Sequence, residues 1–251
     1  MFRLDGVMLN TLAKKITKVP TGLGVPERRG ENVVVPFSDG SRYVKKYLGE
    51  RTISLVMLVQ GASKFDALNT LLGKEGIRLF EMKVGEEWRS IACELRNRMY
   101  YDVVVLPKIA WISIDLVCPD PLFYGGEVEV VIPLTETEHN ITLVNPGTAT
   151  TRRVTMEISG ITSTLEINNE TTDCKLRYGN TTIAGEVLEV KSPENTAIRN
   201  IGGEEENRVG LFTHAGDPAF MVLAPGDNEL EITTEEVPDA MLTFKFYTPY
   251  F

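Results

Sequence analysis

The stretch DLVCPDPLFYGG, residues 115–126, interrupts a regular strand pattern halfway along the chain. Pro119 and Pro121 cannot donate a backbone hydrogen bond to a sheet and favour extended geometry in the residue before them, so they end the strand and stiffen the chain beyond it. Gly125 and Gly126 then permit a turn. We interpret this stretch as a seam between two domains.

The seam divides the 251 residues into halves of different charge. Residues 1–126 contain 18 Lys and Arg against 14 Asp and Glu, whereas residues 127–251 contain 8 against 21. The first half is too weakly basic for a nucleic-acid surface, and the second would repel phosphate. We predict domains at residues 1–122 and 123–251, with aromatic side chains packing across the junction. The proposed seam residues are Pro119, Asp120, Pro121 and Tyr124.

The first half alternates apolar and polar residues with a period of two, which is typical of β-strands. RTISLVMLVQ, residues 51–60, and IAWISIDLVC, residues 109–118, show this alternation most clearly. Residues 63–73 fit one short helix, with Ser63 as its amino cap and Gly73 as its carboxyl cap. We therefore predict an antiparallel, barrel-like β-sheet with a single helix.

Residues 20–50 break the alternation with three Pro and five Gly. The apolar pieces between them are too short to form a core, and loops of this length are uncommon unless they are functional. We predict a projecting hairpin arm that contacts another subunit; an ordinary surface loop is the alternative. The apolar side of that contact would comprise Leu23, Val25, Val33, Val34 and Val35, and the arm also carries Arg28, Arg29, Lys45 and Lys46.

The second half has short strand candidates separated by turn signals about every eight to twelve residues, which is typical of a β-sandwich. The candidates include AFMVLA, residues 219–224, and MLTFKFY, residues 241–247. We assign Phe244 and Phe246 in the latter to the core. GGEEEN, residues 202–207, is interpreted as a solvated turn between two strands.

The chain offers no recognisable catalytic or metal-binding motif. His139 and His214 lie outside any nucleophile–base pattern, and there is no P-loop, dinucleotide fingerprint or metalloprotease motif. Cys93, Cys118 and Cys174 lack metal-ligand spacing and indicate structural thiols in a reducing cytoplasm. No stretch reaches the ~18 apolar residues of a membrane span, and the amino terminus is not a secretory signal. We therefore expect a protein that has no enzymatic activity, binds no cofactor and does not insert into a membrane.

Five stretches follow one another along the chain: FRLDG at residues 2–6, VPFSDGSRYVKKYLGERTISLVMLVQG at 35–61, VCPDPLFYGG at 117–126, NPGT at 145–148 and LAPGDNELEI at 223–232. Taken in this order, they resemble the distal tail protein (Dit) family of siphophages. The last two are similar to the galectin-like carboxyl-terminal domain of that family. The resemblance covers essentially the whole chain.

The resemblance implies a structural virion protein, without enzymatic activity, at the tip of a long non-contractile tail. Six copies would form a homo-hexameric ring through their first domains and join the tail tube protein to the baseplate hub or tail-associated protein. The second domains would point outward, with receptor-binding proteins as further partners. DNA would pass through the ring without sequence-specific contacts, and assembly would take place in the host cytoplasm.

Two other classes of function stay open at this point. A carbohydrate-binding accessory protein for host-wall attachment would fit a β-sandwich, but such sites normally use a Trp or Tyr platform. Trp88 and Trp111 both lie in the first half. A hydrolase would require carboxylates of the second half to converge in a cleft.

Overall fold

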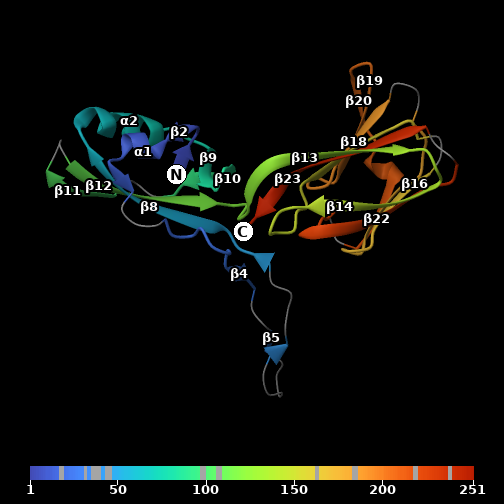
Figure 1. Ribbon diagram of the computed structural model, residues 1–251, viewed down its shortest axis with the longest axis horizontal. Coiled ribbons are helices and arrows are strands. Elements are labelled where there is room, and N and C mark those ends of the chain that lie inside the picture. The colour runs from blue at the N-terminus through green and yellow to red at the C-terminus, as the bar shows by residue number, and fades with distance from the viewer. Residues whose placement is uncertain are drawn as a thin grey trace. The chain divides into compact units, whose positions relative to one another are not determined.

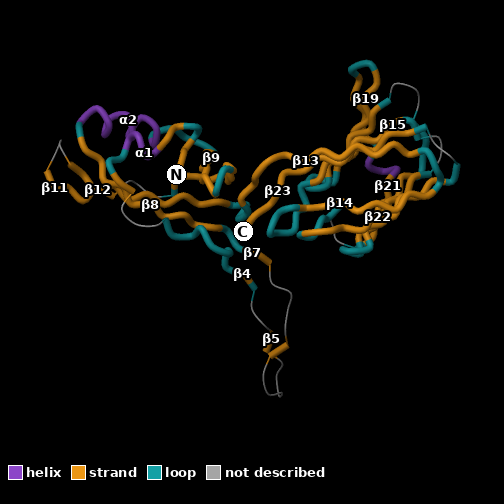
Figure 2. Tube along the Cα trace, in the orientation of Figure 1, coloured by secondary structure: helices purple, strands orange, loops and turns teal. Residues whose placement is uncertain are grey.

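The computed structural model of the protein describes residues 1–16, 20–30, 33–34, 41–42, 47–96, 100–105, 109–161, 164–182, 186–216, 220–236 and 239–251. The fold is mainly β, built from antiparallel sheets, as the sequence predicts (Figure 1, Figure 2). Two compact units divide the chain: unit 1 comprises Met1–Tyr124 and Phe251, and unit 2 comprises Gly125–Tyr250. That each unit folds as a separate domain stays a prediction.

Unit 1 contains two connected antiparallel sheets. The first has the order β2–β1–β9–β10–β13 and the second the order β3–β8–β12–β11, and β10 also pairs with β12. The strand bounds are β1 (Phe2–Leu4), β2 (Val7–Met8), β3 (Lys15–Ile16), β8 (Arg51–Gln60), β9 (Arg78–Val84), β10 (Glu87–Leu95), β11 (Tyr100–Val105), β12 (Ile109–Cys118) and β13 (Phe123–Leu134).

A two-residue turn fixes the amino-terminal hairpin of the first sheet. Asp5 (φ 49°) and Gly6 (φ 75°) join β1 to β2 in the left-handed backbone region, which Asp-Gly adopts readily between paired strands. The Asp5 carboxylate accepts hydrogen bonds from Arg78 Nε at 2.7 Å and from the Leu79 N–H at 2.9 Å. These bonds tie the hairpin to β9.

The second sheet of unit 1 confirms the period-two pattern. β8 and β12 pair over their whole length, from Arg51 opposite Cys118 to Gln60 opposite Ile109. Burial alternates along both strands, so every second side chain enters the core. The buried apolar residues of these strands are Ile53, Leu55, Met57, Val59, Ala110, Ile112, Ile114, Leu116 and Cys118.

Unit 1 also contains the helices α1 (Leu9–Leu12) and α2 (Ala62–Leu72), and the latter buries Leu68, Leu71 and Leu72. The predicted cap at Ser63 is wrong, because Gly61, at φ 101°, occupies the cap position and Ser63 lies inside the helix. Gly73 follows the last helical residue and donates its N–H to Asn69 O. No helix in the described ranges is long and apolar enough to cross a membrane.

Unit 2 is a sandwich of two antiparallel sheets. One has the order β13–β23–β15–β18–β19–β20 and the other the order β14–β22–β16–β17–β21. The bounds are β14 (Glu138–Asn145), β15 (Val154–Ser159), β16 (Leu165–Asn169), β17 (Cys174–Tyr178), β18 (Val187–Lys191), β19 (Thr196–Ile201), β20 (Glu204–Asn207), η1 (Val209–Leu211), β21 (Phe212–Ala215), β22 (Gly226–Thr234) and β23 (Ala240–Tyr250). Phe244 and Phe246 are buried in the common core, as predicted.

The seam glycines do not turn the chain. Gly125 and Gly126 lie inside β13, which runs from Phe123 to Leu134, and neither has a positive φ. The predicted turn there is therefore wrong: the strand that leaves unit 1 is the strand that begins unit 2.

Two further predictions for unit 2 are also wrong. Glu204–Asn207 forms the exposed strand β20 rather than a turn; the turn before it is made by Gly202 (φ 58°) and Gly203 (φ 91°). Of AFMVLA, residues 220–224 form no strand and make only an isolated bridge through Leu223. Buried polar side chains hold this segment instead, as described below.

Candidate assembly site

The predicted arm is a hairpin in the residues that the structure describes. β4 (Arg28–Arg29) pairs with β7 (Tyr47–Leu48), and β5 (Val33–Val34) pairs with β6 (Ser41–Arg42), both antiparallel. Figure 1 shows β4 and then β5 in succession along the hairpin. Neither ladder pairs with any other described strand. Ladders of two residue pairs are marginal on their own in water, so the hairpin would gain stability from a partner surface.

The root of the arm is held against β8 by backbone contacts. Thr21 and Ser54 exchange hydrogen bonds of 3.2 and 3.3 Å. Gly22, at φ 79°, approaches β8 so closely that a Cβ would lie 1.9 Å from Thr52 O, so only glycine fits. The Arg51 Nη1 atom donates to Gly22 O at 3.1 Å. The root is thus a fixed point from which the hairpin departs.

Arg51 is a buried cation with incomplete hydrogen bonding. Its exposed fraction is 3%, its guanidinium lies 4.8 Å from the centre of the Phe123 ring, and Nε and Nη2 have no hydrogen-bond partner among the described residues. Burial lowers the pKa of Arg51, and Asp120 acts in the opposite direction. An arginine remains charged under these conditions, so the unmatched donors carry a desolvation cost.

The apolar arm residues differ in their exposure. Val25 is 67% exposed, whereas Leu23 is partly buried and Pro26 is buried. Val33 and Val34 form β5; their side chains, and Val35 altogether, lie outside what the structure describes. Whether these residues meet another subunit stays a prediction. The described cations of the arm, Arg28 and Arg29, are exposed, and Lys45 and Lys46 also lie outside the described residues.

Asp120 organises the seam. Its Oδ1 accepts from the Leu122 N–H at 3.2 Å, and its Oδ2 accepts from the Tyr124 hydroxyl at 2.8 Å. Tyr124 also stands opposite Ser90, whose hydroxyl donates to the Tyr124 carbonyl at 3.3 Å. Pro119 is exposed and Pro121 is partly buried. These bonds fix the end of β12 relative to the start of β13.

Unit 2 contains a cluster of three buried asparagines that the sequence analysis missed. Asn228 accepts from the Ala224 N–H at 2.8 Å through Oδ1, and its Nδ2 donates to the carbonyls of Ala224, Gly226 and Leu143. Asn169 Nδ2 donates to Val222 O at 2.8 Å, and Asn145 Nδ2 donates to Ala149 O at 3.0 Å. All three residues have an exposed fraction of 0%. The asparagines in the NPGT and APGDN stretches are the sequence signal that would have indicated this cluster.

The cluster explains why residues 220–224 are not a strand. Ser192, also buried, accepts from the Met221 N–H at 2.5 Å and donates to Met221 O at 2.8 Å. Together with the bond from Asn169 to Val222 O, these side chains replace the partners that a neighbouring strand would supply.

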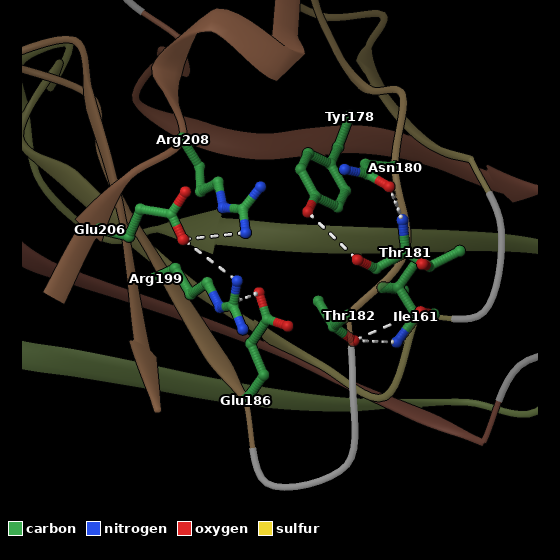
Figure 3. Close-up of polar contacts among 9 residues, drawn as sticks. All are labelled: Ile161, Tyr178, Asn180, Thr181, Thr182, Glu186, Arg199, Glu206 and Arg208. Carbon is green, nitrogen blue, oxygen red and sulfur yellow. Dashed lines mark hydrogen bonds and ion pairs between the residues drawn. The ribbon is translucent and has the colours of Figure 1, made fainter. Parts of the chain in front are cut away.

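A second polar group in unit 2 is an ion-pair chain beside Tyr178 (Figure 3). Glu206 Oε2 lies 3.1 Å from Arg199 Nη1 and 2.9 Å from Arg208 Nη2, and Arg199 Nε lies 3.5 Å from the buried Glu186 Oε1. Burial, followed by the charge of Glu186, raises the pKa of Tyr178. The group contains no nucleophile beside a base; its geometry links β19, β20 and η1.

A hollow of about 580 Å³ lies on the outward face of β15, β18 and β23. Thr155 stands opposite both Lys191 and Lys245, so these residues form a row across three strands. Lys245 Nζ lies 2.6 Å from Glu157 Oε1, and that hydrogen bond raises the pKa of Lys245. The lining also includes Glu127, Arg153, Glu189, Glu194 and Tyr247.

Carboxylates of the second half do converge at this hollow, but Glu157 and Glu189 each pair with a lysine. His139 Nε2 accepts the N–H groups of Thr135 and Glu136, and His214 packs edge-on against Phe220. No cluster of metal-binding side chains occurs among the described residues.

Comparison with known proteins places the fold in two steps. No protein-family model and no curated protein matches the sequence. The structural class of this chain is that of a two-unit β protein, in which a first unit of two sheets carries a hairpin arm and the second unit is a β-sandwich. Within that class the chain has the fold of a phage distal tail protein: it is similar to the SPP1 Dit protein, with a TM-score of 0.66 and 16% identity over 98% of this chain and 99% of that chain. That structure is described as a paradigm of the hub adsorption apparatus in phages infecting Gram-positive bacteria.

A structure of the phage P2 baseplate in its activated conformation with Ca aligns with a TM-score of 0.44 and 8% identity, over 90% of this chain and 88% of that chain.

Proposed function

We propose that this chain is a structural protein of a phage tail tip, where six copies form a ring that joins the tail tube protein to the baseplate hub or tail-associated protein. The ring would be built from unit 1, with DNA passing through its lumen without sequence-specific contacts. Unit 2, a galectin-like sandwich in this proposal, would face outward and provide a platform for receptor-binding proteins. Assembly would take place in the host cytoplasm before the protein becomes part of the virion.

The observation that carries the proposal is the similarity of fold to SPP1 Dit, which extends over 98% of this chain and 99% of that chain. The arm adds independent support. A closed ring needs two different faces on each subunit, and a hairpin that departs from a fixed root supplies one of them. Val25, 67% exposed beside that root, is apolar surface that a neighbouring subunit would cover.

The test is the solution mass of the purified full-length protein, measured alone and with tail tube and hub proteins, together with negative-stain images. We expect a hexameric ring. A variant in which a short Gly-Ser linker replaces residues 27–48 keeps Thr21 and Gly22 at the root, so unit 1 should fold while ring closure is lost. A ring that persists in this variant would remove the arm from the interface, and a monomer under every condition would overturn the assignment.

We also propose that the chain has no catalytic role. His139 caps a turn and His214 packs against a ring, so His139→Ala and His214→Ala should leave tail assembly intact. A turnover that depends on either histidine would reverse this conclusion.

A second candidate function is carbohydrate binding at the hollow of unit 2. Tyr247 is 49% exposed and lines the hollow beside Arg153 and Lys245, so one aromatic face lies near several hydrogen-bonding groups. Sugar rings bind through such combinations. An array of wall oligosaccharides tests this: binding should be lost in Tyr247→Ala and kept in Met241→Ala, an exposed change on the same strand outside the lining.

A further inference from the structure

Cys93 and Cys118 face each other across two strands of unit 1. β10 and β12 pair antiparallel, with Glu94 opposite Val117 and Leu95 opposite Leu116, so the same register places Cys93 directly opposite Cys118. Cα atoms of directly opposed residues lie about 4.5–5.5 Å apart, within the range that a disulfide spans. Both cysteines are free thiols with an exposed fraction of 0%.

The surroundings make the two thiols unequal. Cys118 and Cys93 share a hydrogen bond, and Phe80 N–H and the buried Arg78 guanidinium also favour a thiolate at Cys93. The pKa of Cys93 is lowered chiefly by the Cys118 hydrogen bond, whereas the pKa of Cys118 is raised by the same bond and by burial. Positive charge and hydrogen-bond donors beside a sulfur favour its thiolate, and the burial of Cys93 acts in the opposite direction on its pKa.

We propose that Cys93 and Cys118 form an oxidation site, at which a small peroxide converts the two thiols into an intramolecular disulfide. Cys93 would attack one peroxide oxygen; the O–O bond breaks, water is released once a proton is taken up, and Cys93 becomes a sulfenic acid. The Cys118 sulfur then attacks Cys93, the S–O bond breaks, and a second water leaves with the Cys118 proton. Two thiols are oxidised by two electrons and one hydrogen peroxide is reduced to two waters.

The position of the pair gives this bond a structural consequence. β10 is the strand that pairs with both sheets of unit 1, and Cys118 is the last residue of β12 before the seam. A disulfide there would lock the corner at which the two sheets meet. The protein would keep free thiols in a reducing compartment and gain the covalent link on exposure to an oxidant.

The experiment treats the folded full-length protein with hydrogen peroxide, denatures and alkylates it, and maps the cysteines by mass spectrometry. We expect a linked pair of peptides containing Cys93 and Cys118, a mass loss of about 2 Da, and alkylated Cys174. The melting temperature should rise by roughly 5–10 °C, because the link restrains the unfolded chain. Dithiothreitol should reverse both changes.

The matched variants are Cys93→Ser and Cys118→Ser, which should lose the bond, and Cys174→Ser, in unit 2, which should keep it. Serine in an apolar strand can destabilise the fold. The cysteine mapping of the unaltered protein is therefore sufficient to test the proposal without the variants. Two thiols that remain alkylatable after treatment would overturn the proposal. So would a sulfinic acid at Cys93 without a link, or a disulfide that joins two chains through Cys174.

Discussion

The asparagine cluster of unit 2 and the arm root of unit 1 solve the same problem differently. Both bury strongly polar side chains against irregular backbone. Asn228 uses its oxygen and both amide hydrogens on neighbouring groups, all within unit 2. Arg51 makes one hydrogen bond, to Gly22 O, and leaves Nε and Nη2 without a partner among the described residues.

The two regions therefore differ in how completely their buried polar groups are hydrogen-bonded. Buried polar groups are nearly always matched in native proteins, and each exception needs a cause. Unit 2 satisfies its asparagine cluster internally, although Arg208 Nε in the same unit is also buried without a hydrogen-bond partner among the described residues. The arm root leaves two guanidinium donors of a buried cation without a partner among the described residues, at a cost in desolvation.

The largest effect expected is the loss of unit 2 stability in Asn228→Ala. This change leaves the Ala224 N–H and several carbonyls without their hydrogen-bond partner, so the free energy of unfolding should fall by about 3 kcal/mol or more. Urea unfolding measures it. Asn140→Ala, on an exposed residue of the same unit, should change it by less than about 0.5 kcal/mol. Equal effects would show that the cluster is not a special centre of stability.

Gly22→Ala should have the next largest effect. The new Cβ would meet Thr52 O, and the left-handed backbone is unfavourable for alanine, so the root should open and cost about 2 kcal/mol in unit 1. Gly24→Ala is the control, since nothing lies within 4 Å of a Cβ there and its φ is ordinary. Hydrogen exchange at the Thr21 amide follows the opening; unchanged protection in Gly22→Ala would contradict the close approach.

A smaller effect is expected at Asp5, a matched polar group of unit 1. Burial raises its pKa, but hydrogen bonds from the Leu79 N–H and Arg78 outweigh this and bring the pKa below its ordinary value. The stabilisation is therefore present above the unfolded-state pKa of about 4 and is lost as the pH falls through the folded-state pKa. Asp5→Asn keeps the turn but removes this dependence. The stability difference between the two proteins should shrink from pH 7 to pH 2; a constant difference would rule the linkage out.

The smallest effect is expected for Arg51→Met in the isolated subunit. Methionine gives up one hydrogen bond but also removes two unmatched donors, so the free energy of unfolding should stay within about 1 kcal/mol. A large loss of stability would mean that the guanidinium is fully matched, and the contrast with Asn228 would disappear. Thermal unfolding of both proteins at one concentration decides this.

The sequence predicted the parts of the fold that depend on periodicity. A strand with one buried face must alternate, so Ile53 to Val59 and Ala110 to Cys118 could be assigned to inner faces without a structure. The arm was also predictable as a hairpin, because its Pro and Gly content excludes a strand that belongs to a sheet core. The mainly β fold follows from the same signals, whereas the likeness to Dit came from the order of short motifs along the chain.

The failures share one physical cause: composition does not reveal tertiary partners. Residues 220–224 have strand composition, yet Ser192 and Asn169, distant in sequence, occupy their hydrogen-bonding groups. Gly125 and Gly126 can turn, but a sheet neighbour keeps them extended: the Thr248 hydroxyl donates to Gly126 O at 3.2 Å. The sequence predicts Arg51 as the first residue of a strand, and only the structure shows that its side chain is buried against Gly22.

The pairing of β13 with β23 determines how readily unit 2 can be exchanged for another module. Unit 2 starts in β13 and finishes in β23, and these strands are hydrogen-bonded neighbours joined near both ends of the unit by Thr248 and Gly126. A module whose two termini are adjacent can be circularly permuted or exchanged for another with little disturbance to its scaffold. Recombination at this junction would let one first unit acquire different second units while the fold of the first unit stays constant.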